Sequence, residues 1–105
     1  MKYVAFKMKL KPGFKDAYKR RHDAIWPELK QWLKASGITD YRIFLDEETD
    51  TLFAVQKQAG ETSSQDLGDN PIVQKWWAYM ADIMVTHSDN SPISMPLEEM
   101  FYLGD

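Results

Sequence analysis

Residues 40–58, DYRIFLDEETDTLFAVQKQ, hold two segments of alternating apolar and polar residues on either side of an acidic turn. The first segment is Asp40–Leu45 and the second is Thr51–Gln58, with the polar residues 46–50 between them. A side-chain period of two, interrupted by turn formers, predicts a β-hairpin. The residues expected on one face of its first strand are Tyr41, Ile43 and Leu45.

Upstream of this hairpin, one more strand and two helices are predicted. Tyr3–Leu10 alternates apolar and basic residues, which favours a strand. A helical period then follows, but Pro27 interrupts it, and proline is tolerated only in the first turn of a helix. We therefore expect two consecutive helices, Gly13–Asp23 and Trp26–Ala35, with Gly37 ending the second.

Downstream of the hairpin, we expect a further helix and a last strand. Asn70 followed by Pro71 is a helix start, and the apolar period continues through Met84. Leu97–Leu103 is expected to form the last strand. Gly60–Gly68 is polar and without a clear period, so it is either a loop or a weak helix.

The predicted order of elements is strand, broken helix, strand, strand, helix and strand in a single domain, residues 1–105. This order predicts an α+β, ferredoxin-like fold with an antiparallel sheet and helices on one face. Both faces of the strands carry apolar groups, and a bare apolar face is unusual on a monomer. We therefore expect a homodimer in which a second copy packs on that face. The opposed residues are Ala5, Phe44 and Phe101 on one side and Phe6, Ile43 and Met100 on the other.

The composition excludes several classes of function. The chain has 13 Lys and Arg and 16 Asp and Glu, which gives a net charge of -3. No nucleic-acid partner is therefore expected. There is no cysteine, and no apolar run approaches the ~20 residues that span a bilayer. The alternating N-terminus favours a strand over a signal peptide, so we expect no membrane partner and a cytoplasmic location. Metal-ligand spacing and nucleotide-binding glycine patterns are missing, so neither a metal nor a cofactor is expected.

His22 is the candidate for proton transfer. Tyr18, His22 and Ile25 are spaced to share one helix face, which Ile25 orients inward. Because an ordinary histidine has a pKa of about 6.5, it exchanges a proton near neutrality. This face therefore suits the floor of a pocket, although a half-buried histidine satisfied by local carbonyls fits the same spacing.

Three further aromatic residues are candidates for the pocket wall. Trp76 and Trp77 are adjacent on a predicted helix, so one ring can pack in the core while the other lies at the rim of a cavity. An indole stacks well on the C–H face of a sugar, but both rings could instead serve only core and interface. Tyr41 is expected to be buried with a hydroxyl that needs a partner. His87 is expected in an exposed loop.

Four blocks of the chain form a recognisable pattern: Arg20–Leu29 (RRHDAIWPEL), Trp76–Met80 (WWAYM), Asp89–Pro92 (DNSP) and Phe101–Leu103 (FYL). Through these blocks the chain resembles the L-rhamnose mutarotase family over essentially its whole length. Two segments depart from the family pattern. Asp23-Ala24 stands where relatives also carry Asn-Pro, and residues 61–69 match no family pattern, which bears on the preferred sugar.

This resemblance implies a dimeric α+β barrel that interconverts the α and β anomers of L-rhamnose for rhamnose catabolism, without a cofactor. It implies that His22 is the proton donor, which would protonate the ring oxygen. It also implies that Tyr18, Tyr41, Trp76 and Trp77 contact the sugar. The base stays open among a water, a tyrosine and a carboxylate.

Two other functions remain open at this point. Small ferredoxin-like dimers with tryptophan-rich pockets also suit cofactor-independent monooxygenases of polycyclic aromatics, by analogy of fold alone. Oxygen uptake with a quinol would identify that activity. A non-catalytic binding module would instead hold L-rhamnose without speeding the exchange of its anomers.

Overall fold

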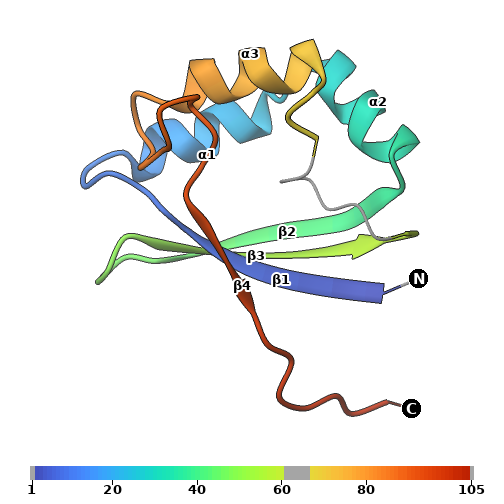
Figure 1. Cartoon of the computed structure of the whole chain (residues 1–105). Helices are drawn as coiled ribbons and strands as arrows, with labels where there is room; N and C mark the ends of the chain where they lie inside the picture. The colour runs from blue at the N-terminus through green and yellow to red at the C-terminus, as the bar shows by residue number, and fades with distance from the viewer. Residues whose placement is uncertain (1, 61–66, 105) are drawn as a thin grey trace.

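The computed structural model describes residues 2–60 and 67–104, and within them the chain forms a sheet covered by helices. The elements are β1 (Lys2–Lys9), α1 (Lys15–Asp23), α2 (Pro27–Ala35), β2 (Ile38–Asp46), β3 (Thr51–Gln58), α3 (Pro71–Met80) and β4 (Ser94–Leu97). All these helices lie over the same face of the sheet (Figure 1). Among the described helices, none has the length and apolar character needed to cross a membrane.

The sheet has the strand order β2-β3-β1-β4, and all neighbouring strands are antiparallel. The central pair runs in register from Lys2 opposite Gln58 to Lys9 opposite Thr51. The hairpin of β2 and β3 lies where the alternating pattern predicts it. The α+β class and the antiparallel sheet with helices on one face are confirmed.

The break between the first two helices follows from Pro27. Trp26, the N-cap of α2, is extended with φ -61° and ψ 131°, and Pro27 opens the helix. Proline suits that position because the first N–H groups of a helix have no intrahelical partner. Gly37 follows α2 with φ +87°, and a Cβ there would meet the Cβ of Ala59 at 3.1 Å. The tight entry into β2 therefore requires glycine.

The core lies between the helices and the inner face of the sheet. Inward residues alternate with outward ones along β3, as a half-buried strand requires. The buried apolar cluster consists of Phe6, Met8, Leu10, Tyr18, Leu29, Leu52, Ala54, Val73, Trp76, Met80, Ile83 and Met84.

Truncating Leu52 tests this core. The Leu52→Ala variant is expected to lose about 2–5 kcal/mol of unfolding free energy, because the buried side chain leaves a cavity. Urea denaturation measures the loss. Lys75→Ala, at an exposed position of α3, is the control and should change stability by less than about 0.5 kcal/mol. Equal stability of the two variants would contradict the placement of Leu52.

The prediction that the third helix runs through Met84 is wrong, because α3 ends at Met80. The backbone beyond it bonds to the end of the first strand instead. The N–H of Lys11 donates to the carbonyl of Ile83, and the N–H of Val85 donates to the carbonyl of Lys9. These long-range bonds satisfy groups that a longer helix would have paired internally.

The prediction of a last strand over Leu97–Leu103 is also wrong. The strand is Ser94–Leu97, four residues that pair with β1. Beyond it the chain leaves the sheet (Figure 1), and its apolar side chains lie in solvent, with Phe101 78 % exposed. An apolar pattern does not specify whether a ladder partner exists in the same chain. Of the segment Gly60–Gly68, residues 61–66 lie outside the described ranges, so its loop-or-helix alternative stays a prediction.

Candidate active site

A cavity of about 760 Å³ lies between the helices and the inner face of the sheet. Its volume is within the roughly 300–1,000 Å³ typical of small-molecule pockets. Side chains from all three helices and from β2 line it. All five residues predicted for the site are among them: Tyr18, His22, Tyr41, Trp76 and Trp77.

Tyr18 and His22 stack on one face of α1. Their ring centroids are 4.2 Å apart and the planes are tilted by 22°. The Nδ1 atom of His22 lies 3.1 Å from the backbone carbonyl oxygen of Tyr18. Because a carbonyl only accepts, Nδ1 carries the hydrogen of the neutral ring, and Nε2 is left to take up or release a proton.

The environment of this pair sets both protonation states. Burial lowers the pKa of His22, while its hydrogen bond to the Tyr18 carbonyl and the nearby Asp23 carboxylate act in the opposite direction. Burial raises the pKa of the Tyr18 phenol far above its usual range, and the Tyr41 phenol adds to that rise. At neutral pH Tyr18 is therefore a hydrogen-bond donor, and His22 is mostly neutral.

The lowered pKa of His22 makes the stability of the chain depend on pH. Between this lowered value and the ordinary value of 6.5, the unfolded chain binds more protons than the folded one. The free energy of unfolding should therefore fall as the pH drops below 6.5. The fall should end once the pH is below the pKa that His22 has in the folded chain. His22→Gln is expected to weaken this dependence, which urea denaturation at a series of pH values measures. Identical slopes in both proteins would contradict a lowered pKa of His22 in the folded chain.

Trp76 and Trp77 divide between core and rim as their adjacency predicts. Trp76 is 8 % exposed, and its ring meets His22 edge-on, with the centroids 5.3 Å apart. Trp77 is half-buried, and a Cβ at Gly68 would lie 2.9 Å from its indole ring. The absence of a side chain at Gly68 thus lets Trp77 lie close against the backbone.

Tyr41 reaches the cavity from the opposite side, on β2. Its ring meets the buried ring of Phe6 edge-on at 6.4 Å between centroids. The strand therefore presents Tyr41 to the helices, across the cavity from Tyr18, whose pKa it influences. The two phenols and the imidazole line one space although they come from two different elements.

A second layer of aromatic contacts was not predicted. Trp26 and Tyr79 lie against Trp76, with ring centroids 5.0 Å and 5.6 Å away. Arg21 binds the carboxylate of Asp82 with both Nη atoms, at 2.8 and 3.1 Å, and its guanidinium lies 4.6 Å from the centre of the Tyr79 ring. This contact ties α1 to the end of α3. The i, i+3 spacing of Trp76 and Tyr79 was an available signal, whereas nothing in the sequence links Arg21 to Asp82.

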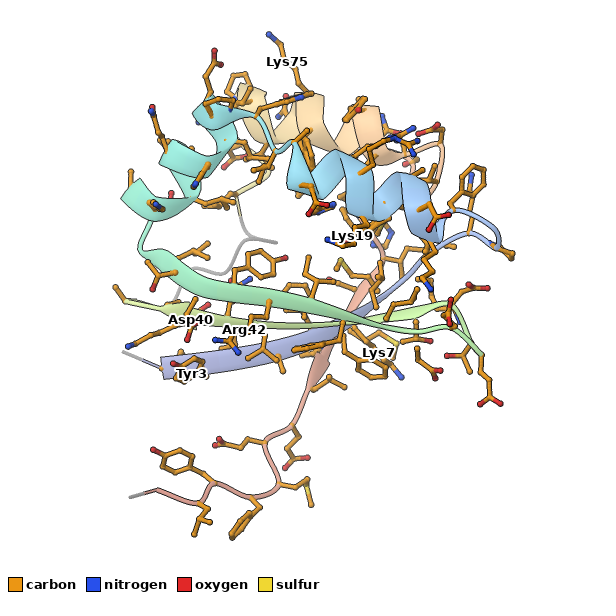
Figure 2. The ribbon with its side chains drawn as sticks, turned by 180° about the vertical axis from the view of Figure 1, so that it is seen from behind. Tyr3, Lys7, Lys19, Asp40, Arg42 and Lys75 are labelled. Atoms are coloured by element: carbon orange, nitrogen blue, oxygen red, sulfur yellow. The ribbon has the colours of Figure 1, made fainter. Side chains whose placement is uncertain are left out.

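Charged side chains, Lys19 and Asp23 among them, are also part of the cavity lining. Lys19 lies on the sheet-facing side of α1, whereas Lys75 points away from the sheet (Figure 2). Both carboxylate oxygens of Asp23 accept from Lys19 at 3.0 Å.

Across residues 2–60 and 67–104, no group of three or more His, Asp and Glu is placed to hold a metal ion. His87 is exposed, as predicted, and does not line the cavity.

Fold and cavity together define an α+β protein whose sheet and helices enclose a cavity that is lined by aromatic side chains and has a histidine on its wall. The chain matches the model of the L-rhamnose mutarotase family over residues 3–103. It therefore belongs to the L-rhamnose mutarotase family.

Individual members of the family are similar in sequence to this chain over nearly its full length. An L-rhamnose mutarotase of Formosa agariphila is 62 % identical over 103 residues, which are 98 % of this chain and 99 % of the relative. One of Phocaeicola vulgatus is 60 % identical over the same shares. The crystal structure of an L-rhamnose mutarotase from Formosa agariphila superposes with a TM-score of 0.92 at 59 % identity, covering 99 % of this chain and all of that one.

Proposed function

We propose that this chain interconverts the α and β anomers of L-rhamnose in support of rhamnose catabolism. The observation that carries the proposal is the position of His22 on the wall of an aromatic cavity whose volume is in the range of small-molecule pockets. Family membership supports the same sugar, since the relatives are named L-rhamnose mutarotases.

Mutarotation needs only proton transfers and room for one bond to rotate. A base removes the proton of the anomeric hydroxyl while His22, in the imidazolium form that is its minor form at neutral pH, gives its Nε2 proton to the ring oxygen, and the bond from the anomeric carbon to that oxygen breaks. The carbonyl then turns about the C1–C2 bond. The ring hydroxyl attacks the other carbonyl face, its proton returns to His22, and the base returns its proton to the new anomeric oxygen.

The remaining cavity residues hold the sugar. Tyr18 is a protonated phenol and donates a hydrogen bond to a sugar hydroxyl, so the base stays open among a water, another tyrosine and a carboxylate. Tyr41 contacts the sugar from the sheet side, and the indoles of Trp76 and Trp77 cover its apolar C–H face. Because these contacts hold the sugar in one orientation against His22 and the base, the proton transfers occur within the bound complex.

Polarimetry of freshly dissolved α-L-rhamnose tests the activity. The optical rotation should reach its equilibrium value sooner with the protein than without it, in proportion to protein concentration. Saturable binding of L-rhamnose with an unchanged approach to equilibrium would instead identify a binding module. Oxygen consumption with a quinol substrate would favour the monooxygenase.

We also propose that the chain is a single domain with the ferredoxin-like arrangement, which the strand order β2-β3-β1-β4 supports. The domain acts in the cytoplasm. Two copies pair through the outer faces of their sheets to form a dimeric α+β barrel. The face carries exposed apolar residues in sequence-distant strands, and the C-terminal segment adds more. These residues are Tyr3, Phe44, Phe53, Met95, Leu97, Met100, Phe101, Tyr102 and Leu103.

Sedimentation velocity tests the dimer. Phe44, 58 % exposed, lies on the edge strand β2 opposite Phe53 of β3. Phe44→Glu places a charge there and is expected to yield monomers at concentrations where the unchanged chain is dimeric. Lys75→Glu, on the outer side of α3, should leave the dimer intact. A monomeric unchanged chain at micromolar concentration would contradict the proposal.

A further inference from the structure

The edge strand β2 contains one residue more than the stretch of β3 that it faces. Ile38 lies opposite Gln58, and Ile43 lies opposite Ala54, so five steps along β2 match four steps along β3. The shift falls within residues 39–42. One extra residue in one strand of an antiparallel pair is a β-bulge, which bends the strand and redirects its side chains.

With this bulge, Ile38 and Tyr41 face the same side of the sheet although they are three positions apart in the sequence. Ile38 is 2 % exposed and faces inward, and so do Tyr41 and Ile43, which pack against the same core. In a regular strand, side chains alternate between faces, so positions 38 and 41 would lie on opposite sides of the sheet. With the extra residue between them, Ile38 can fill the core while Tyr41 lines the cavity.

Asp40 is the residue whose backbone makes the bulge. Its φ is +49°, in the left-handed region. Among residues with a side chain, Asp and Asn adopt this region most readily, and β-branched residues avoid it. Its carboxylate is held at the same end of the sheet: Tyr3 Oη donates to Oδ2 at 2.9 Å, and Arg42 Nε lies 3.4 Å from Oδ1 (Figure 2).

We propose that Asp40 is a positioning residue for the sugar site, because its left-handed backbone sets the orientation in which Tyr41 enters the cavity. The proposal rests on the proposed function for its kinetic readout. The residues on either side of the bulge are fixed by packing, since Ile38 is buried before it and Ile43 packs against the core after it. A change of backbone conformation at Asp40 should therefore move mainly Tyr41.

Variants at position 40 distinguish the effect of the backbone conformation from the effect of the Asp40 side chain. Asp40→Gly and Asp40→Asn keep the left-handed conformation accessible and should leave KM for L-rhamnose within about threefold of the unchanged chain. Asp40→Val disfavours it and should raise KM about tenfold, as expected for one lost sugar contact of Tyr41. The saturated rate should change less, because His22 lies on another element. The same Asp40→Val change in a Tyr41→Phe background should raise KM by less.

Two matched changes control for general destabilisation. Asp50 has nearly the same backbone, φ +53°, but lies in the turn between β2 and β3 and does not line the cavity. Asp50→Val should therefore lower the melting temperature without raising KM. Deleting Asp40 restores a regular pairing in which Ile38, Tyr41 and Ile43 stay on the same face of the sheet. The deletion therefore removes the local bend that orients Tyr41, and KM for L-rhamnose should rise in this variant too. An unchanged KM in a folded deletion or Asp40→Val variant overturns the proposal, as does a rise in Asp50→Val.

A second readout does not depend on any reaction. Fluorine NMR of 3-fluorotyrosine-labelled protein gives a Tyr41 signal that Tyr41→Phe identifies. In Asp40→Val this signal should shift and become more accessible to a soluble paramagnetic probe, while in Asp40→Gly it should stay in place. An unmoved signal in Asp40→Val overturns the inference. Failure of the unchanged chain to speed anomer exchange would refute the proposed function alone, since the fluorine result still reports the position of Tyr41.

Discussion

His22→Gln is expected to slow anomer exchange by about 10²–10⁴-fold, the usual contribution of a positioned general acid or base. Glutamine keeps a polar side chain of similar reach but has no proton to transfer near neutrality. The stacked Tyr18 ring and the edge of Trp76 remain to fill the wall, so the fold should persist. Exchange spectroscopy on the anomeric protons measures the rate, and circular dichroism checks the fold.

His87→Gln is the matched control for this change. His87 is exposed in the turn after α3 and lies outside the cavity. Its replacement should leave the exchange rate within about twofold, as for surface substitutions away from the site. A folded His22→Gln protein as active as His87→Gln would remove His22 from the mechanism.

Trp76→Ala is expected to have the largest effect on stability, about 3–5 kcal/mol, because a buried indole leaves a large cavity. Aromatic pairs with His22, Trp26 and Tyr79 are lost at the same time, each of which adds about 0.5–1.5 kcal/mol beyond burial. Sugar affinity should fall as well, because the wall beside His22 disappears. Urea denaturation and KM for L-rhamnose measure the two effects.

Trp77→Ala separates the two roles. Trp77 is half-buried at the cavity, so its loss should raise KM with a smaller loss of unfolding free energy than Trp76→Ala. Trp76→Phe should recover part of the stability, since a ring still meets Trp26. If Trp77→Ala destabilised the chain more than Trp76→Ala, the division between core and rim would be reversed.

Local patterns predicted much of the framework because they are set by neighbouring residues. Alternation over residues 40–58 gave the hairpin, and Pro27 gave the break between α1 and α2. Helical spacing placed His22 on the same face as Tyr18, and the structure adds that both line one cavity with Tyr41. The roles of these residues in catalysis stay predictions, and the resemblance to the family supplied them.

Long-range pairing accounts for what the sequence did not predict. The third helix ends early because residues 83–85 pair with the end of β1. The C-terminal segment has apolar residues, but residues 98–104 have no ladder partner in the described part of the chain, so the apolar composition led to a wrong strand prediction. The bulge at Asp40 and the contact between Arg21 and Asp82 each depend on residues that meet only in the folded chain.

Saturation-transfer proton NMR on L-rhamnose at anomeric equilibrium tests the central claim most directly. One anomeric proton is irradiated and the intensity of the other is followed, with and without the protein. We predict that saturation passes to the second anomer only in the presence of the protein, and that His22→Gln abolishes the transfer. A well-folded chain that gives no transfer would contradict the claim that this cavity interconverts the anomers of L-rhamnose.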